Sequence, residues 1–567
     1  MSYKSFIITY WHWLILIIAA VIFFIGVSSF NYYAQSENFI KFLSPDESAN
    51  YTFAKLYAQE SRTQFFEKYN ILAGDVIHPR SYRSDFGWLK PVSFLGIILI
   101  YGKIAGVIGY QILPYLTPLF AALGIIFYYL SVKIIFGRSN ALISALMLTA
   151  FPPYIYYSAR SMFHNVLFMV LVLAAFYFAM IAAGRHKAEA TAAGAYRTYF
   201  YAALGGSMLG LAVITRASEL IWLLPVWLII WLVNIKKIGA AKSVIFIAFF
   251  LFALVPALFW NKILYQSYWR GGYNEMNQSI LVMAGAGADL VKSGLLRADE
   301  ASQSLAQIKN NFFHFGFQPL KSLNMLYYYF IKMFYWIFWP ALLGFLLMLK
   351  KIKKWRRRHY VYFSAYLTAS AILLLYYGSW DFHDNPDPKS FTIGNSYARY
   401  WLPIYMGAIP LVSVLLVKLS NLFRKKYLIY GFRLIIIALM FFISLKFVLA
   451  GSEEGLISSA KRLSSSKAEY DRLLSLTESR AVIITQYHDK LIFPQRKVIV
   501  GLFNDDNMIA EYAALAKVLP VYYYNFTFPK KDIEYLNNRK LADFGLRIER
   551  VEAVAKNFTL YRLSARE

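Results

Sequence analysis

Apolar segments long enough to cross a bilayer alternate with short polar loops through the first 450 residues of the chain. A transmembrane helix needs about 20 mainly apolar residues, and these segments approach or exceed that length. The pattern therefore predicts a polytopic α-helical membrane protein with about eleven transmembrane helices. The predicted spans cover about residues 11–33, 113–136, 141–157, 166–183, 199–214, 220–233, 244–260, 326–349, 360–377, 401–417 and 428–450.

One further apolar segment, Val92–Ile108, decides the predicted topology. If it crossed the bilayer, the densest basic loop (residues 350–358) would fall on the outer side, although cytoplasmic loops are the ones rich in Lys and Arg. We therefore expect Val92–Ile108 to lie at the outer surface as a juxtamembrane helix, opened by Trp88–Pro91. The N-terminus is then cytoplasmic, and residues 34–112 and 261–325 form the long outer loops.

After Gly451 the pattern changes to short apolar runs separated by polar turns, which is typical of strands in a small soluble domain. We predict a transmembrane domain over residues 1–450 and an extracytoplasmic α/β domain over residues 451–567, joined by a polar helix at Ser458–Leu476. This domain either binds the acceptor or stabilises the fold. Asp505-Asp506 and His488-Asp489 are candidate sites in this domain, but we favour the interpretation that these acids are solvated surface residues. Strands are predicted at 481–485, 497–500, 521–524 and 558–563, and a helix at 508–518.

The composition agrees with a membrane protein and narrows the partners. Hydrophobic residues make up 59% of the 567, and the absence of cysteine excludes disulfides and thiol metal sites. The net charge of +28 would suit a nucleic-acid-binding protein, but the densest basic run lies directly between two apolar spans. Basic residues in that place are typical of cytoplasmic membrane anchors. We therefore expect membrane lipids, and no nucleic acid, among the partners.

Two adjacent carboxylates, Asp46 and Glu47, follow the first span in the sequence Ser44-Pro45-Asp46-Glu47. The amphipathic segment Ala49–Tyr69 comes next and predicts a helix on the outer membrane surface. Ser-Pro-Asp-Glu is a good helix start, so one interpretation is that both acids only cap this helix. The other is catalytic, because a membrane enzyme that removes a proton from its acceptor needs a carboxylate of this kind. We favour the catalytic interpretation.

Four short motifs follow one another along the first 450 residues. They are Asp46-Glu47 after the first span, Lys90-Pro91 at the start of the juxtamembrane helix, Ser158-Ala159-Arg160 at the end of the third span, and Ala398-Arg399-Tyr400-Trp401-Leu402-Pro403 at the start of a late span. In this order they resemble the GT-C superfamily of polyprenyl-phosphate-sugar-dependent glycosyltransferases, and within it the protein O-mannosyltransferase and aminoarabinose-transferase group. Val92 stands where the family usually has a second Pro. The Trp-Trp-Asp-Tyr-Gly motif of oligosaccharyltransferases is absent from the sequence.

The resemblance implies a base and a set of cations on the outer face. Asp46 would deprotonate the acceptor, and Glu47 would orient the acceptor or assist. Cations would stabilise the negative charge that develops on the leaving phosphate. The alternative is that these long basic side chains only snorkel to the interface. The candidates for phosphate and donor binding are Lys90, Arg399, Arg160, Arg80, Arg83 and Arg270, together with Arg216.

His78 is a candidate ligand for a divalent metal ion, as occurs in some enzymes that the chain resembles. His164 and His383 fall on the same predicted face. A lone His at an interface also serves as a simple hydrogen-bonding residue, so no cofactor is firmly expected. The sequence contains no P-loop and no dinucleotide-binding glycine motif, which argues against a nucleotide-sugar donor.

We therefore expect an integral-membrane glycosyltransferase in a prokaryotic plasma membrane. It would move a sugar from a polyprenyl-phosphate donor to a lipid, glycan or protein acceptor on the extracytoplasmic face. The alternative is a transporter or flippase of a lipid-linked glycan. Such proteins carry charges within their spans and often contain inverted repeats, whereas here the polar residues gather in the predicted outer loops.

Overall fold

The computed structural model describes residues 3–36, 38–184, 192–273, 316–382, 384, 387, 390–451 and 454–566. Contacts divide the chain into two compact units, each built from three stretches of sequence. The helical unit comprises Met1–Phe30, Tyr115–Ala257 and Leu281–Ser458, and the mixed unit comprises Asn31–Pro114, Leu258–Ile280 and Ser459–Glu567. The predicted domain limits, 1–450 and 451–567, stay a prediction.

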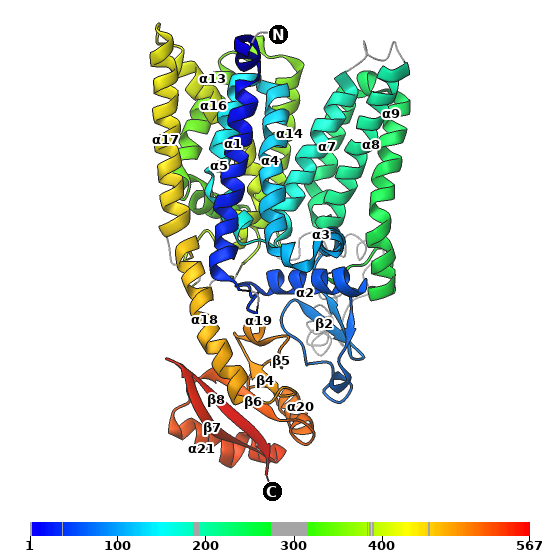
Figure 1. Ribbon diagram of the computed structural model, residues 1–567, viewed down its shortest axis with the longest axis vertical. Coiled ribbons are helices and arrows are strands. Elements are labelled where there is room, and N and C mark those ends of the chain that lie inside the picture. The colour runs from blue at the N-terminus through cyan, green and yellow to red at the C-terminus, as the bar shows by residue number, and fades with distance from the viewer. Residues whose placement is uncertain are drawn as a thin grey trace, which may run out of the picture. The chain divides into compact units, whose positions relative to one another are not determined.

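The long apolar segments are helices, as predicted (Figure 1). Eight helices in the described ranges are long and apolar enough to cross a membrane, and a bent pair would make nine. Helix α1 leaves Leu14, Val21 and Ile25 exposed, which suits a bilayer and would be unfavourable in water. The protein is therefore an integral, multi-pass membrane protein. The membrane helices and the shorter helices between them are α1 (Tyr3–Ala34), α4 (Leu113–Phe136), α5 (Arg138–Thr149), α6 (Pro152–Ala159), α7 (His164–Gly184), α8 (Ala192–Thr215), α9 (Leu220–Tyr265), α12 (Pro319–Leu326), η5 (Tyr327–Lys332), α13 (Tyr335–Leu349), α14 (Arg357–Gly378), α15 (Ser396–Tyr400), α16 (Leu402–Ser420) and α17 (Lys426–Ala450).

The predicted spans differ from these helices in three places. The segments predicted at 220–233 and 244–260 form the single element α9, which breaks at Gly239, where φ is +72°. The segment predicted at 141–157 is divided into α5 and α6, because Phe151 is extended before Pro152. The segment predicted at 326–349 is bent by 101° between Lys332 and Tyr335. The count of eleven spans therefore stays a prediction.

Close approach of small residues holds part of the helical unit together. Helix α16 packs against α5 and α13, and α7 packs along α8. A Cβ atom at Gly344 of α13 would lie 2.0 Å from the carbonyl oxygen of Leu411 in α16, so only glycine permits this contact. Small residues at helix crossings let backbones approach in this way inside membranes.

The first part of the mixed unit is a surface helix followed by a small sheet. Helix α2 (Pro45–Glu60) begins four residues earlier and ends nine residues earlier than the predicted helix Ala49–Tyr69, because Ser61 takes a left-handed conformation. Strands β1 (Phe65–Phe66), β3 (Trp88–Pro91) and β2 (Tyr82–Asp85) form an antiparallel sheet in that order. The prediction that Trp88–Pro91 opens a helix is therefore wrong.

Helix α3 (Leu95–Ile108) follows this sheet and packs against α2. With 14 residues it is about 21 Å long. A bilayer core is about 30 Å thick, so this helix is too short to span it alone. Its position outside the bilayer stays a prediction.

The C-terminal part of the mixed unit contains a five-stranded sheet in the order β5-β4-β6-β8-β7. The three strands β5, β4 and β6 are parallel, and β8 and β7 are antiparallel to their neighbours. All four predicted strands and the predicted helices are present, whereas β7 was not predicted. The elements are α18 (Leu456–Leu476), β4 (Val482–Thr485), α19 (Asp489–Ile492), β5 (Lys497–Val500), α20 (Asp506–Ala516), β6 (Val521–Phe526), α21 (Lys530–Tyr535), β7 (Leu546–Ala555) and β8 (Phe558–Ala565).

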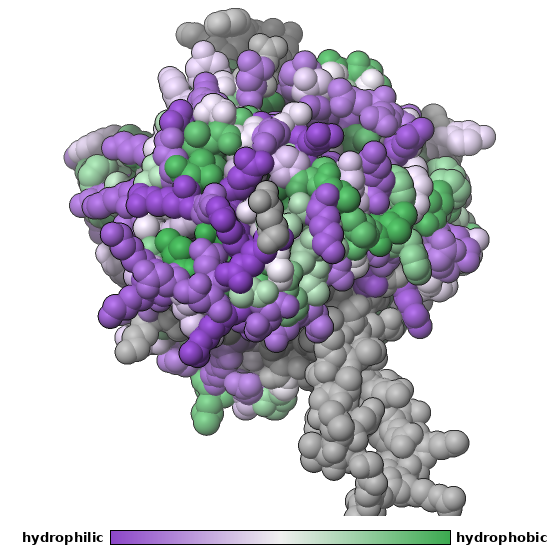
Figure 2. Space-filling model, turned by 90° about the horizontal axis from the view of Figure 1, so that it is seen from below, coloured by the Kyte–Doolittle hydropathy of each residue, from purple (hydrophilic) through white to green (hydrophobic). Residues whose placement is uncertain are grey.

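Alternation along the strands places apolar side chains on both faces of this sheet. Val482 and Ile484 belong to one buried cluster, and Ile483 between them belongs to another. Ala73 and Ile77 from the first predicted outer loop join the cluster that contains Val482. The loop and the sheet therefore share a hydrophobic core. Hydrophilic side chains predominate on the face of the molecule seen in Figure 2.

Candidate functional site

The start of helix α2 places the two adjacent carboxylates in different environments. Ser44 is the N-cap and Pro45 occupies the first turn, where its missing N–H costs no hydrogen bond. Glu47 is fully buried, and its Oε2 accepts a hydrogen bond from the Ser44 backbone N–H at 2.9 Å. Asp46 is half-buried, and its Oδ1 accepts one from Ser81 Oγ at 2.7 Å. Glu47 therefore contributes to the cap, and Asp46 is held by a distant loop.

The loop that carries Ser81 also carries two predicted cations. Arg80 forms a two-pronged contact with the Asp489 carboxylate, with 2.6 Å between Nη2 and Oδ1. Arg83 Nε donates to Asp85 Oδ1 at 3.1 Å. Asp489 is fully buried, so the prediction that it is a solvated surface acid is wrong. A carboxylate at this depth needs a cation beside it, and Arg80 supplies the charge.

Lys90 on strand β3 is buried among groups of the mixed unit. Its ammonium donates to the carbonyl oxygen of Leu264 at 2.7 Å, pairs with Asp85, and lies 4.7 Å from the centre of the Tyr265 ring. Arg270 is exposed. The fold therefore brings Lys90 and Arg83 to the same carboxylate, Asp85.

In the helical unit, two predicted cations lie against one aromatic ring. The guanidinium groups of Arg160 and Arg399 lie 5.5 Å and 4.6 Å from the centre of the Phe163 ring. Arg160 Nη1 donates to the Tyr156 hydroxyl at 2.8 Å, and Arg399 Nη2 donates to Ser396 Oγ at 2.8 Å. The structure thus brings together two residues that are 239 positions apart in the sequence, the difference between 399 and 160.

A buried ion pair between Arg216 and Glu219 lies next to Arg399. Only Arg216 was among the predicted candidates. Arg216 Nε donates to Glu219 Oε1 at 2.9 Å, and its guanidinium lies 4.6 Å from the centre of the Tyr400 ring. The Tyr377 hydroxyl donates to the same carboxylate oxygen at 2.8 Å. Glu219, Arg399 and Tyr400 line one small cavity. The spacing of Arg216 and Glu219, three residues apart between two spans, was the sequence signal for this pair.

His78, the candidate metal ligand, lies beside a backbone carbonyl group. Its Nδ1 lies 3.0 Å from the Pro79 carbonyl oxygen, and burial lowers the pKa of its imidazole. Within the described ranges there is no group of three His, Asp or Glu residues that could hold a metal ion. His164 begins α7 in the helical unit, and His383 lies outside the described residues.

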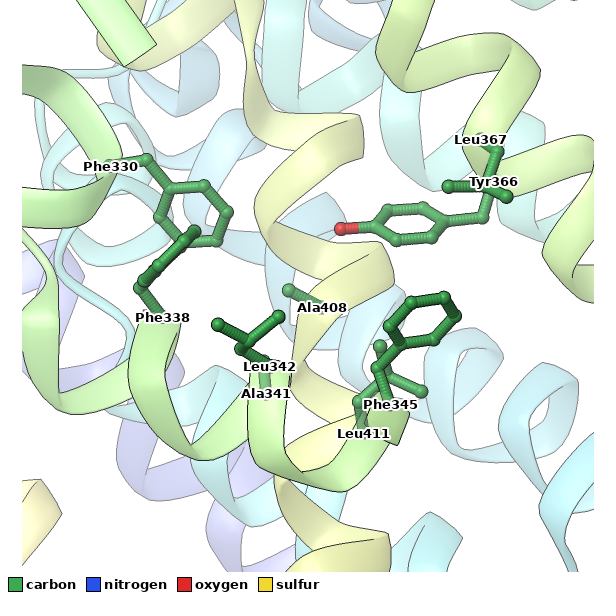
Figure 3. A pocket seen from close by; sticks show the side chains of 9 residues that line it. All are labelled: Phe330, Phe338, Ala341, Leu342, Phe345, Tyr366, Leu367, Ala408 and Leu411. Carbon is green, nitrogen blue, oxygen red and sulfur yellow. The ribbon is translucent and has the colours of Figure 1, made fainter. Parts of the chain in front are cut away.

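An apolar groove lies beside the bent pair of helices (Figure 3). Its volume is about 130 Å³. The side chains that form it come from η5, α13, α14 and α16, and the rings of Phe330, Phe345 and Tyr366 lie around the opening in the view of Figure 3. Such a surface suits a hydrocarbon chain, because its one polar group, the Tyr366 hydroxyl, already donates to the Ile404 carbonyl oxygen at 3.1 Å.

Comparison with known proteins identifies the fold. No protein-family model and no curated protein sequence matches the chain. Among solved structures, the oligosaccharyltransferase AglB from the archaeon Archaeoglobus fulgidus, in complex with an inhibitory peptide and a dolichol-phosphate, matches with a TM-score of 0.55 at 14% identity. The match covers 95% of this chain and 71% of AglB. The same enzyme in complex with Zn and sulfate matches with a TM-score of 0.51 at 14% identity, and this match covers 93% of this chain and 69% of AglB.

A third structure, ArnT from Cupriavidus metallidurans bound to undecaprenyl phosphate, covers 97% of this chain and 98% of its own at 10% identity. Its TM-score is 0.47. The two matches to AglB extend over nearly the whole chain. The chain therefore has a GT-C-like fold.

Proposed function

We propose that the protein is a membrane glycosyltransferase that moves a sugar from a polyprenyl-phosphate donor to an acceptor on the extracytoplasmic face. The observation that carries this proposal is the GT-C-like fold with a carboxylate, Asp46, at the start of the first surface helix. The AglB structure with dolichol-phosphate supports a lipid-linked donor. The acceptor is a lipid, a glycan or a protein.

In the proposed reaction Asp46 is the general base. It removes a proton from the acceptor as the acceptor atom attacks the anomeric carbon of the sugar. The bond between that carbon and the phosphate oxygen breaks, and its electron pair stays on the polyprenyl phosphate. Glu47, which caps α2, fixes the backbone that carries Asp46 and assists in orienting the acceptor.

The leaving phosphate gains negative charge, which fixed guanidinium groups stabilise. Arg399 and Arg160 are the leading candidates, because the Phe163 ring lies against both guanidinium groups and so brings two cations together. Lys90, Arg83 and Arg270 are further candidates. Arg80 is the weakest, since its charge already compensates buried Asp489. The groove beside α13 is the candidate for part of the polyprenyl tail. No step is assigned to a metal ion.

The test is sugar transfer by the purified protein in proteoliposomes. A polyprenyl-phosphate hexose with a labelled sugar is supplied together with a membrane extract that contains acceptors. We expect label to leave the donor and enter an acceptor, with release of polyprenyl phosphate in equal amount. Movement of the intact donor between leaflets, with no label transferred, would contradict the proposal and favour a flippase.

A further inference from the structure

The C-terminal sheet contains a point where ligands usually bind. The chain runs from β4 to its neighbour β5 and then crosses to β6 on the other side of β4. In sheets of parallel strands, such a reversal opens a crevice at the carboxyl ends of the strands, and ligands bind there. Here β4 ends at Thr485, the loop that follows it ends at His488, and Asp489 begins the short helix α19.

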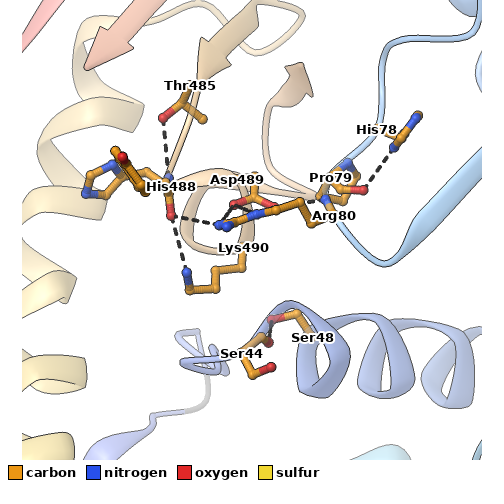
Figure 4. A network of polar contacts seen from close by, with 10 residues as sticks. Ser44, Ser48, His78, Pro79, Arg80, Thr485, His488, Asp489 and Lys490 are labelled. Atoms are coloured by element: carbon orange, nitrogen blue, oxygen red, sulfur yellow. Dashed lines mark hydrogen bonds and ion pairs between the residues drawn. The ribbon is translucent and has the colours of Figure 1, made fainter. Parts of the chain in front are cut away.

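A segment of the chain itself binds to this loop (Figure 4). The backbone N–H of Arg80 donates to Asp489 Oδ2 at 2.9 Å, and its guanidinium donates to Asp489 Oδ1 at 2.6 Å and to the Tyr487 carbonyl oxygen at 3.3 Å. Asp489 is fully buried, whereas 39% of the Arg80 side chain remains exposed. The main chain of residue 80, and not only its charge, is therefore fixed against the end of β4.

The next residue, Ser81, is the one that contacts the candidate base. Its φ of +65° is in the left-handed region, which non-glycine residues adopt only when their surroundings impose it. Ser81 Oγ donates to Asp46 Oδ1 at 2.7 Å, and the Ser81 carbonyl oxygen accepts from the Val92 N–H at 3.2 Å. The direction of the hydroxyl thus depends on how Arg80 and Val92 hold the backbone on either side.

Two further contacts tie the same regions together. The Tyr82 ring lies 4.9 Å from Phe53 of α2 and 5.2 Å from Phe493, just beyond Asp489. Lys41, ahead of α2, donates to the Phe493 carbonyl oxygen at 2.6 Å. The segment before α2 and the segment after Arg80 therefore both attach to the loop and short helix that follow β4.

We propose that Asp489 is a positioning residue for the transfer reaction. The C-terminal domain binds residues 80–82 at the carboxyl end of its sheet, and this contact sets the Ser81 hydroxyl against Asp46. The inference rests on the proposed function in one respect, the role of Asp46 as base. It assigns to the C-terminal domain the task of aligning that base, rather than of binding the acceptor.

Hydrogen exchange measured by mass spectrometry tests the positioning without any need for sugar transfer. In Asp489→Asn we expect faster exchange of the Arg80 amide and also of the Val92 amide, which touches Ser81 and not Asp489. Exchange in strands β4 and β6 should stay at the wild-type level, which shows that the domain is folded. An unchanged Val92 amide would overturn the proposal, whether or not the protein transfers sugar.

Kinetics then test the link to the reaction. In Asp489→Asn we expect kcat to fall by about 10-fold to 100-fold, because misplacing a catalytic group by about 1 Å has effects of this size. The KM for the donor should stay within about twofold of the wild-type value. Ser81→Ala should show the same kinetic changes with normal exchange at Arg80.

The matched control is Glu552→Gln. Glu552 pairs with Arg472 at 2.5 Å in the same domain, away from residues 80–82, so its loss should leave exchange and kinetics unchanged.

If Asp489→Asn does not fold, Arg80→Lys serves instead, because it keeps a cation beside Asp489 and removes the two-pronged contact. Kinetics of Asp489→Asn equal to those of Glu552→Gln would contradict a positioning role. If the wild type transfers no sugar, the proposed function fails, and exchange at Val92 still decides whether Asp489 sets the loop.

Discussion

The candidate residues of the helical unit and those of the mixed unit are held across different sequence separations. In the helical unit three guanidinium groups each donate to a near neighbour in sequence: Arg160 to Tyr156, Arg399 to Ser396 and Arg216 to Glu219. In the mixed unit, Asp46 is held by Ser81, 35 residues away, and Arg80 is held by Asp489, 409 residues away.

This difference has a physical consequence. Contacts three or four residues apart form together with their own segment and depend little on the rest of the fold. Contacts between distant segments exist only once the mixed unit has assembled. Damage to the C-terminal domain should therefore disturb Asp46 and Arg80 and leave the cations of the helical unit in place.

The largest expected effect comes from Asp46→Asn. The change keeps the shape and the hydrogen bond from Ser81 but removes the base, so transfer should fall by about 10²-fold to 10⁴-fold. The unfolding midpoint should stay near that of wild type. Glu60→Gln, at the exposed end of the same helix, is the control. Transfer at the wild-type rate in Asp46→Asn would exclude Asp46 as the base.

Loss of a cation in the helical unit should have the next largest effect. Arg399→Ala should lower kcat/KM by about 10²-fold to 10³-fold, because a fixed donor to the developing phosphate charge is lost. Arg399→Lys should recover part of the rate, since it restores the charge without the planar group that lies on Phe163. Arg433→Ala, which removes contacts to Ser420 and Asn421, is the control and should be unaffected. Equal rates for Arg399→Ala and the control would remove Arg399 from the phosphate site.

Glu47→Ala sharpens the distinction between the adjacent carboxylates. Because Glu47 accepts the Ser44 N–H, its loss should lower the free energy of unfolding by about 0.5–2 kcal/mol, as for other helix caps. Transfer should fall far less than in Asp46→Asn. Thermal unfolding and transfer rates measured on the same samples separate the two roles. A loss of rate as large as that of Asp46→Asn, with unchanged stability, would make Glu47 catalytic as well.

Local signals accounted for much of what could be predicted from the sequence. The long apolar runs identified the spanning helices, and the short runs after Gly451 identified four strands of the C-terminal sheet. Strand β7 escaped because it is an edge strand with bulges, and its exposed residues Arg547, Glu549 and Arg550 obscure the alternation. The capping role of Glu47 was also foreseeable, since Ser-Pro-Asp-Glu is a local motif.

The environment of the acids could not be predicted, because nothing in the local sequence links Ser81 to Asp46 or Arg80 to Asp489. Asp489 looked like a surface acid, since its burial depends on a loop from the other end of the chain. Trp88–Pro91 was expected to open a helix because apolar residues follow it. Pairing with β1 and β2, which is a tertiary effect, makes it a strand instead.

The smallest expected effect on transfer concerns Lys41, whose ammonium is also held by distant segments. It donates to the Phe493 carbonyl oxygen and to Gln495 Oε1, and burial lowers the pKa of its ammonium from 10.5 to about 7. Between these two values the unfolded chain binds a proton that the folded chain does not. The free energy of unfolding must therefore rise with pH across this window, by at most about 1.4 kcal/mol per pH unit.

Lys41→Met removes this titration. Relative to Lys41→Met, the wild type should gain stability steadily from about pH 7 to pH 10, because less charge has to be buried as the ammonium loses its proton. Thermal unfolding midpoints of the two proteins measured across that range give the comparison. Lys531→Met, at an exposed position in α21, should differ from wild type by a constant amount at every pH. A constant difference for Lys41→Met as well would mean that Lys41 titrates as an ordinary lysine. The mixed unit would then not hold its charged residues as tightly as the contacts at Phe493 indicate.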